Sequence, residues 1–240
     1  APSGKVRDIH TPQPAIYSVQ QRILKRVLYS LPISIAAYGG VPKRSHMGAA
    51  KLHLSQPGEM IQTDVVNAFT QTSYSQVSRA LREHLKPMLW AFSLNKEERK
   101  IIVGWLTHLM VINPQGGRFP SLPLGTPTSL AVFNLVWTHI DADVIKLCHQ
   151  LSPHSPIRYT RYVDDLSFSV DPQIPDELIP RLSHILGEHG YQLNTEKTRQ
   201  SNRDEAIIHG LCWRAGQLDL PDQTIIRLSQ RVHRLQRLIA

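Results

Sequence analysis

The 240-residue sequence contains few cysteines and no long apolar run. Its two cysteines, Cys148 and Cys212, lie far apart, which argues against both a disulfide framework and a cysteine-based zinc site. No segment approaches the roughly 20 apolar residues of a membrane span, and the first residues lack the apolar stretch of a signal peptide. We therefore expect a cytoplasmic protein with no membrane partner.

The short motifs of several common enzyme classes are also missing. The sequence holds no HExxH, GxSxG or P-loop pattern, and its twelve histidines form no cluster with metal-ligand spacing. Asp141 and Asp143 are two residues apart on an expected helix, where they face different sides. They are poor joint metal ligands, and Asp141 is expected to be structural.

Acidic residues are fewer than basic ones. Lys and Arg number 27 against 19 Asp and Glu, which gives a formal net charge of +8. This excess favours polyanionic partners such as nucleic acids through the long-range electrostatic field, although a merely basic protein fits the charge equally well. A hydrophobic content of 41% is ordinary for a folded chain of this length.

The spacing of apolar residues predicts helices and strands without regular βαβ alternation, which is typical of an α+β fold. Helices are expected over residues 17–30, 128–150 and 175–189, and from about 73, 96 and 222 onward. Strands are expected at 60–66 and in two hairpins, which pair 157–162 with 166–170 and 206–213 with 217–220.

Three aspartates fall where a strand end and a hairpin tip would present them. Asp64 lies in the expected strand at 60–66, and Asp164 and Asp165 lie between the strands of the first hairpin. Paired aspartates in a turn are usually simple turn formers, but between buried strands their unpaired charges are costly without a cation. Mg²⁺ prefers oxygen ligands, and two such ions roughly 3.5–4 Å apart promote phosphoryl transfer.

Residues 159–169, Tyr-Thr-Arg-Tyr-Val-Asp-Asp-Leu-Ser-Phe-Ser, resemble the YxDD hairpin of reverse transcriptases, in the form seen in retron and group II intron-like bacterial enzymes. Other matches follow in the family's order across nearly the whole chain. Residues 64–69 resemble the first palm motif. The resemblance implies that Asp64, Asp164 and Asp165 are catalytic metal ligands, with help from the Val65 carbonyl. It also implies that Phe69 is a steric gate favouring deoxynucleotides, with plain core packing as the alternative.

Residues 122–129 with Asn134 resemble the LPQGxPxSxxxxN motif, a turn and helix start that support the template and the incoming nucleotide. Leu124 replaces the usual Gln, which leaves one nucleotide contact in question. The Gly125 backbone is nevertheless expected to approach the substrate closely. Tyr162 of the YxDD match is also assigned to the nucleotide site.

Two further matches bring basic residues toward the triphosphate. Residues 194–198 resemble the motif whose lysine lies near the pyrophosphate, so Lys197 is the expected general acid, although an exposed lysine in a turn is the alternative. Residues 4–9 resemble the fingers hairpin whose arginine grips the triphosphate. That role passes to Arg7, with Lys5 as a second contact, because a planar guanidinium suits phosphate oxygens.

The resemblance implies a right-hand polymerase fold. Residues 1–58 would form the N-terminal part of the fingers, and 59–220 the palm, with inserted fingers helices at about 73–113. Residues 221–240 would begin a minimal or truncated thumb. The implied activity is RNA-directed DNA synthesis from dNTPs on an RNA template and primer. It would use two Mg²⁺ ions, with Mn²⁺ as a substitute.

The subfamily stays open between a retron relative, a group II-like enzyme and an antiviral defence enzyme. Residues 49–53 lack the Asn of the retron NAxxH motif, and Ile208-His209-Gly210 stands in place of the VTG triplet. A partner protein or additional domain that completes the thumb fits the pattern, while the oligomeric state is not specified.

Two other functions remain as alternatives. One is a defence polymerase that synthesises DNA without a template or from a protein primer. The other is a non-catalytic RNA-binding scaffold, for which Leu124 argues weakly. Three retained acids argue against a scaffold, since it has no reason to bear their mutual repulsion.

Overall fold

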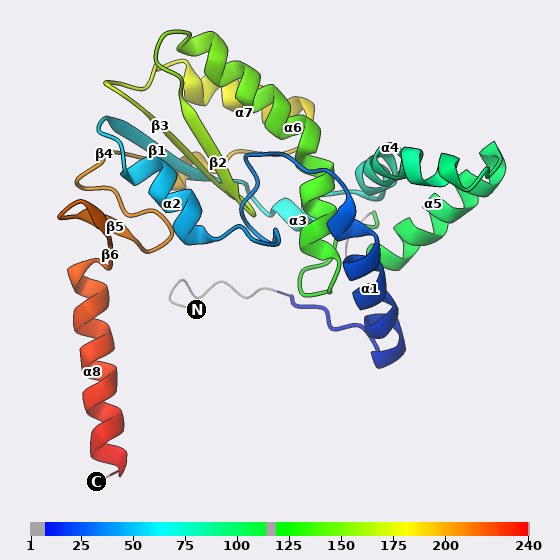
Figure 1. Cartoon of the computed structure of the whole chain (residues 1–240), viewed down its shortest axis with the longest axis horizontal. Coiled ribbons are helices and arrows are strands. Elements are labelled where there is room, and N and C mark those ends of the chain that lie inside the picture. Colours follow the sequence, from blue (N-terminus) through cyan, green and yellow to red (C-terminus); the bar gives the residue numbers. More distant parts are fainter. Residues whose placement is uncertain (1–7, 114–118, 240) are drawn as a thin grey trace.

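The structure is a computed structural model that describes residues 8–113 and 119–239. It is built around a four-stranded antiparallel sheet with the strand order β2-β3-β1-β4 (Figure 1). The strands are β1 (Glu59–Asp64), β2 (Arg158–Tyr162), β3 (Asp165–Val170) and β4 (Arg199–Asn202). The expected first hairpin is therefore confirmed, and its second strand, β3, pairs with β1 at the centre of the sheet.

Helices cover both faces of this sheet. On one face lie α6 (Ser129–Leu151) and α7 (Leu178–Glu188), and on the other lies α2 (His46–Leu54) (Figure 1). Alternate residues of β3 serve the two faces: Leu166, Phe168 and Val170 join the main apolar core, whereas Ser169 bonds to His53 of α2. Burial on both faces explains why five consecutive residues of β3 are buried.

A second group of helices packs beside the sheet around α6. The hairpin of α4 (Tyr74–Ala91) and α5 (Lys96–Met110) contacts α6 through α4 (Figure 1). Each helix of the hairpin begins with a capping box, at Ser73 and Asn95 respectively, which fixes its start close to the expected residue. The helix α1 (Pro14–Arg26) lies against α5, where the Gln20 amide donates to the Leu109 carbonyl at 2.8 Å.

Several elements differ from the expectation. Helix α1 starts at Pro14, because proline suits the first helical turn, and it ends at Arg26 before the 3₁₀ turn η1 (Leu28–Ser30). The second expected hairpin is shorter, with β5 (Cys212–Arg214) and β6 (Gln217–Asp219) turning at Ala215 and Gly216 as predicted. The short helix α3 (Ala68–Gln71), the 3₁₀ turn η2 (Thr195–Lys197) and β4 were not predicted.

The helix α8 (Asp222–Ile239) follows the β5–β6 hairpin and runs away from the rest of the described chain (Figure 1). Its apolar side chains Ile225, Ile226, Leu228, Val232 and Leu235 are exposed. None of the helices in the described residues is both long enough and apolar enough to cross a membrane.

Candidate active site

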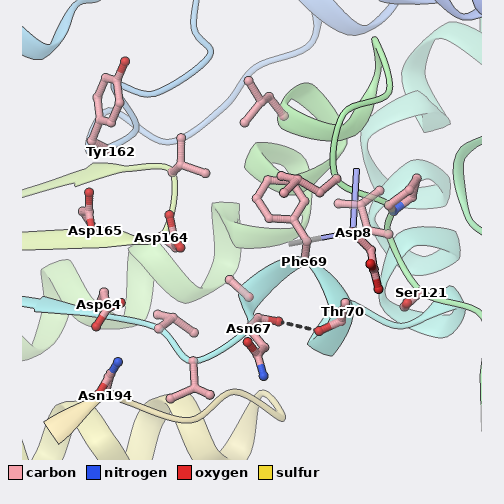
Figure 2. A pocket seen from close by; sticks show the side chains of 18 of the residues that line it. Asp8, Asp64, Asn67, Phe69, Thr70, Ser121, Tyr162, Asp164, Asp165 and Asn194 are labelled. Atoms are coloured by element: carbon pink, nitrogen blue, oxygen red, sulfur yellow. Dashed lines mark hydrogen bonds between the residues drawn. The ribbon is translucent and has the colours of Figure 1, made fainter. Parts of the chain in front are cut away.

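The predicted acids lie beside a cavity of about 570 Å³. The cavity lies where β1 ends, next to the β2–β3 turn and the start of α3 (Figure 2). Asp64 comes from the end of β1, and Asp164 and Asp165 come from the neighbouring hairpin (Figure 2). Asp165 is the first residue of β3, so the hairpin loop contains only Val163 and Asp164.

The sheet register sets these acids next to one another. Asp64 and Asp165 are direct partners in the antiparallel pairing of β1 with β3, and the Val65 amide donates to the Asp164 carbonyl at 3.1 Å. Like charges at opposed positions of two strands destabilise a sheet. The same register that brings the three acids together therefore concentrates negative charge at one edge of the cavity.

Lys197 neutralises part of this negative charge. Its ammonium group lies 2.6 Å from Oδ2 of Asp64, although 60% of the Lys197 side chain is exposed. Asp64 is mostly buried, and its Oδ1 is a buried atom with no hydrogen-bond partner among the described residues. A buried carboxylate oxygen without a hydrogen-bond partner is suited to bind a hard cation, since the bound cation would offset the cost of removing the oxygen from water.

The three acids do not form a closed metal cage by themselves. Within residues 8–113 and 119–239, no three His, Cys, Asp or Glu side chains converge as a ready-made metal site. Mg²⁺ commonly takes one or two carboxylates and completes its shell with water and substrate phosphates. The donor set of Asp64, Asp164 and Asp165 fits an ion of this kind.

Phe69 and Tyr162 also line the cavity. The Phe69 ring stacks on Phe133 of α6 with centroids 4.9 Å apart. Phe69 therefore both packs against the core and lines the cavity. The Tyr162 ring lies 4.8 Å from the His209 ring. Burial, followed by the repulsion from His46, lowers the pKa of His209 to about 4.

Gly125 is not among the residues that line the cavity, although its neighbour Leu124 is. At Gly125, φ is +99°, and an added Cβ would lie 2.5 Å from Cγ2 of Ile9. The glycine thus permits a close approach of the N-terminal segment, whose His10 amide donates to the Leu124 carbonyl at 2.9 Å. Arg7 and Lys5, the predicted triphosphate contacts, lie outside the described residues.

Sequence reasoning missed two parts of the site. Asn194 lines the cavity, and Figure 2 shows it below Asp64; its position three residues before Lys197 was the available signal. The other part is a buried ion pair of Asp141 with Arg161. It lies next to the turn between β2 and β3, residues 163–165, which we call the acid turn. Asp141 was expected to be structural, and its complete burial and its bond to Arg161 agree with that expectation.

Comparison with solved structures gives the class of fold. A telomerase from Candida albicans, solved in complex with a fragment of telomeric RNA, superposes on 82% of this chain and on 36% of its own, with a TM-score of 0.51. The sequence identity is 12%, so the likeness concerns the fold alone. The chain has a reverse-transcriptase polymerase fold of mixed helix and sheet.

Sequence comparison narrows the relationship. The retron Mx65 reverse transcriptase of Myxococcus xanthus is 30% identical over 211 residues, 85% of this chain and 47% of that protein. The retron Mx162 reverse transcriptase of the same organism is 26% identical over 242 residues, 93% of this chain and 48% of that protein. No family model matches the sequence. The chain is a homologue of retron reverse transcriptases and spans about half the length of these relatives.

Proposed function

We propose that this chain carries the catalytic core of an RNA-directed DNA polymerase of the retron type. The observation that carries the proposal is the β1–β3 register, which sets Asp64 opposite Asp165, with Asp164 beside them and Lys197 within reach. The homology to retron reverse transcriptases supports the same assignment. The substrates would be dNTPs, an RNA template and a primer.

Asp64, Asp164 and Asp165 would hold two Mg²⁺ ions, or Mn²⁺ in their place, with the Val65 carbonyl as an additional ligand. Such ions neutralise charge on the triphosphate and lower the pKa of the attacking primer hydroxyl. Lys197 would leave Oδ2 of Asp64 when a cation binds this carboxylate, because the positive charge of the ion would repel the ammonium group. Its ammonium group would then be free to donate a proton to the departing pyrophosphate.

Other residues of the site would select and orient the nucleotide. Phe69 would narrow the space at the ribose 2′ position, and Tyr162 would contact the nucleotide. The Gly125 turn does not line the cavity, so it would support the nucleotide through its neighbour Leu124, which does. Arg7 and Lys5 would hold the triphosphate from the N-terminal segment.

The proposal also divides the chain into the parts of a right-hand polymerase. Residues 1–58 would be the fingers, continued by the helices of about 73–113. Residues 59–220 would be the palm, with the sheet and its acids, and 221–240 would begin the thumb. A partner protein or a further domain would cover the exposed apolar side chains of α8 and complete the thumb. We place this activity in the bacterial cytoplasm, with a defence-associated polymerase as the alternative.

Primer extension tests the proposal. The purified chain is mixed with a primed RNA template, dNTPs and Mg²⁺, and its rate is compared with that of an Asp164→Ala/Asp165→Ala variant. We expect the variant to lose at least about 10³-fold in rate, the scale seen when groups that act as a unit are removed. The exposed Asp176 provides the matched control, since Asp176→Asn removes an acid away from the cavity.

The outcomes separate three readings. Equal incorporation by the wild-type chain and the double variant would overturn the polymerase assignment. Products that do not copy the template, found by sequencing, would favour untemplated or protein-primed synthesis. A salt-dependent RNA affinity that changes neither with Mg²⁺ nor on loss of Asp64 would favour a scaffold.

A further inference from the structure

A fully buried ion pair lies directly behind the acid turn. Arg161 of β2 and Asp141 of α6 are both completely buried. The Arg161 Nε donates to Oδ1 of Asp141 and its Nη2 donates to Oδ2, each at 2.9 Å. The Tyr159 hydroxyl also donates to Oδ1 of Asp141, at 2.8 Å. The carboxylate thus receives three hydrogen bonds and holds the guanidinium in one orientation.

The remaining nitrogen of this guanidinium connects the pair to the turn. Nη1 of Arg161 donates to the Val163 carbonyl at 3.0 Å and to Oδ1 of Asn134 at 3.0 Å. The Asn134 amide in turn donates to the Gly39 carbonyl at 2.9 Å. One network therefore joins α6, β2 and the loop at Gly39 to the residue that precedes Asp164.

The network contacts the turn at Val163, whose backbone conformation is strained. Its φ is +62°, a left-handed conformation that is unfavourable for a β-branched residue. Strained backbone of this kind persists only where the surroundings impose it. The Arg161 bond to the Val163 carbonyl is such a constraint, and it acts one residue before Asp164 and two before Asp165.

Packing leaves the guanidinium little freedom. The Cζ of Arg161 lies 5.0 Å from the centroid of the Trp137 ring and 5.4 Å from that of Phe133. Burial alone would lower the pKa of Arg161, but the Asp141 carboxylate outweighs it and the pKa is raised. The arginine therefore stays charged.

Stability does not account for this arrangement by itself. Replacing a buried ion pair by apolar side chains of similar volume is often neutral or stabilising, so a core packed around β2 and α6 has no need of two charges. A bidentate arginine offers what an apolar pair cannot, a donor in fixed geometry aimed at one backbone carbonyl.

We propose that Arg161, oriented by Asp141 and Asn134, is a positioning residue that fixes the backbone of the acid turn. It sets where Asp164 and Asp165 stand relative to Asp64. The inference rests on the proposed polymerase function for its kinetic consequence, but not for the geometry of the turn. The network acts through the Val163 carbonyl, and neither Arg161 nor Asp141 lines the cavity.

The test replaces the pair by apolar residues. In the Asp141→Leu/Arg161→Met variant, the charges leave together, so the fold is retained while the Val163 carbonyl loses its donor. We expect kcat for single-nucleotide incorporation to fall about 100-fold, the scale of a 1 Å misplacement at an active site. The dNTP KM should stay within about twofold, because binding contacts are kept, and the apparent Mg²⁺ requirement should rise.

Two further variants, one conservative and one a control, distinguish positioning of the turn from a general loss of stability. Arg161→Lys keeps the positive charge beside Asp141 but cannot reproduce the fork, and we expect kcat to fall about 10-fold or more in a folded protein. His53→Gln is the matched control, because His53 is buried against the same two strands through Thr160 and Ser169 but does not contact the turn. It should lower the melting temperature and leave kcat per folded molecule within about twofold.

Mn²⁺ binding, followed by electron paramagnetic resonance, gives a readout besides activity. Weaker Mn²⁺ binding and lower kcat in the folded double variant would support the positioning role. Unchanged kcat and Mn²⁺ affinity in that variant, or in Arg161→Lys if the double variant does not fold, would overturn it. If the wild-type chain does not incorporate nucleotides, the polymerase proposal fails, and the Mn²⁺ comparison alone then decides the positioning role.

Discussion

The dual position of Phe69, on the cavity and against Phe133, allows its two roles to be separated. We predict that Phe69→Val will raise the kcat/KM for ribonucleotides relative to deoxynucleotides by about 10-fold or more, because a smaller side chain admits the 2′-hydroxyl. Steady-state incorporation of matched rNTPs and dNTPs measures the ratio. Phe133→Leu, which changes the fully buried stacking partner, should lower the stability of the protein without altering this ratio. A lower melting temperature with an unchanged ratio in Phe69→Val would leave only the packing role.

His53 gives a prediction about acid stability. Burial, followed by the positive charges of His209 and Arg158, lowers the pKa of His53 to about 3, against 6.5 in the unfolded chain. Between these two values the unfolded state binds the proton and the folded state does not, so stability falls as the pH falls from 6.5 toward 3. From pH 7 to pH 5, this one group should lower the free energy of unfolding by about 2 kcal/mol.

Denaturant unfolding at several pH values measures this slope. The His53→Gln variant should lose that part of the pH dependence while keeping the contribution of the carboxyl groups. Identical slopes in the two proteins would mean that folding does not lower the pKa of His53.

Single residues also show how far sequence reasoning reaches. The hairpin that carries Asp164 and Asp165 was predictable because its strands and its turn are adjacent in sequence. The Arg161–Asp141 pair was not, since an arginine between Tyr159 and Tyr162 in a strand looks like an outward-facing residue. Its partner lies 20 residues away on a helix, and only tertiary packing makes the buried charge tolerable.

At the level of elements, Gly39 is a close contact between the loop before α2 and the acid turn. A Cβ at Gly39 would lie 2.5 Å from the Val163 nitrogen and 2.6 Å from its Cγ2. We predict that Gly39→Ala lowers the free energy of unfolding by about 1–3 kcal/mol through overpacking. It should also slow nucleotide incorporation, because the turn must shift.

Gly104 in α5 is the matched control, since an added Cβ there would meet no atom within 4 Å outside its chain neighbours and the backbone of its own helix. Gly104→Ala should stabilise the protein by about 1 kcal/mol through helix propensity and leave incorporation unchanged. Chemical denaturation and primer extension on both variants measure the two effects. If Gly39→Ala were as stable and active as the wild-type chain, the loop would not constrain the turn.

The elements that escaped prediction share a physical cause. Strand β4, with the sequence Arg-Gln-Ser-Asn, has no alternating apolar residues and is a strand only because it pairs with the edge of β1. Helix α3 has four residues, too few for a helical period to be recognised, and it follows Asn67 at a φ of +47°. By contrast, α4 and α5 carry both apolar periodicity and capping boxes, so their starts were predictable.

At the scale of the whole molecule, the net charge of +8 and the projecting helix α8 bear on nucleic-acid binding. Arg227, Arg231 and Arg234 of α8 are exposed. If α8 begins the thumb, these arginines should lie on the phosphates of the template and primer. Each phosphate contact contributes about 0.7–0.9 to the slope of log affinity against log salt concentration.

We therefore predict that replacing all three arginines by Gln will lower this slope by about two units or more for a primed RNA template. The control removes the same charge from α5, with Lys96, Arg99 and Lys100 replaced by Gln. Fluorescence anisotropy at several salt concentrations measures both slopes. Because the two variants change the long-range field alike, a larger loss in the α8 variant reports direct phosphate contacts, whereas equal losses would assign binding to the general charge and leave α8 without a nucleic-acid role.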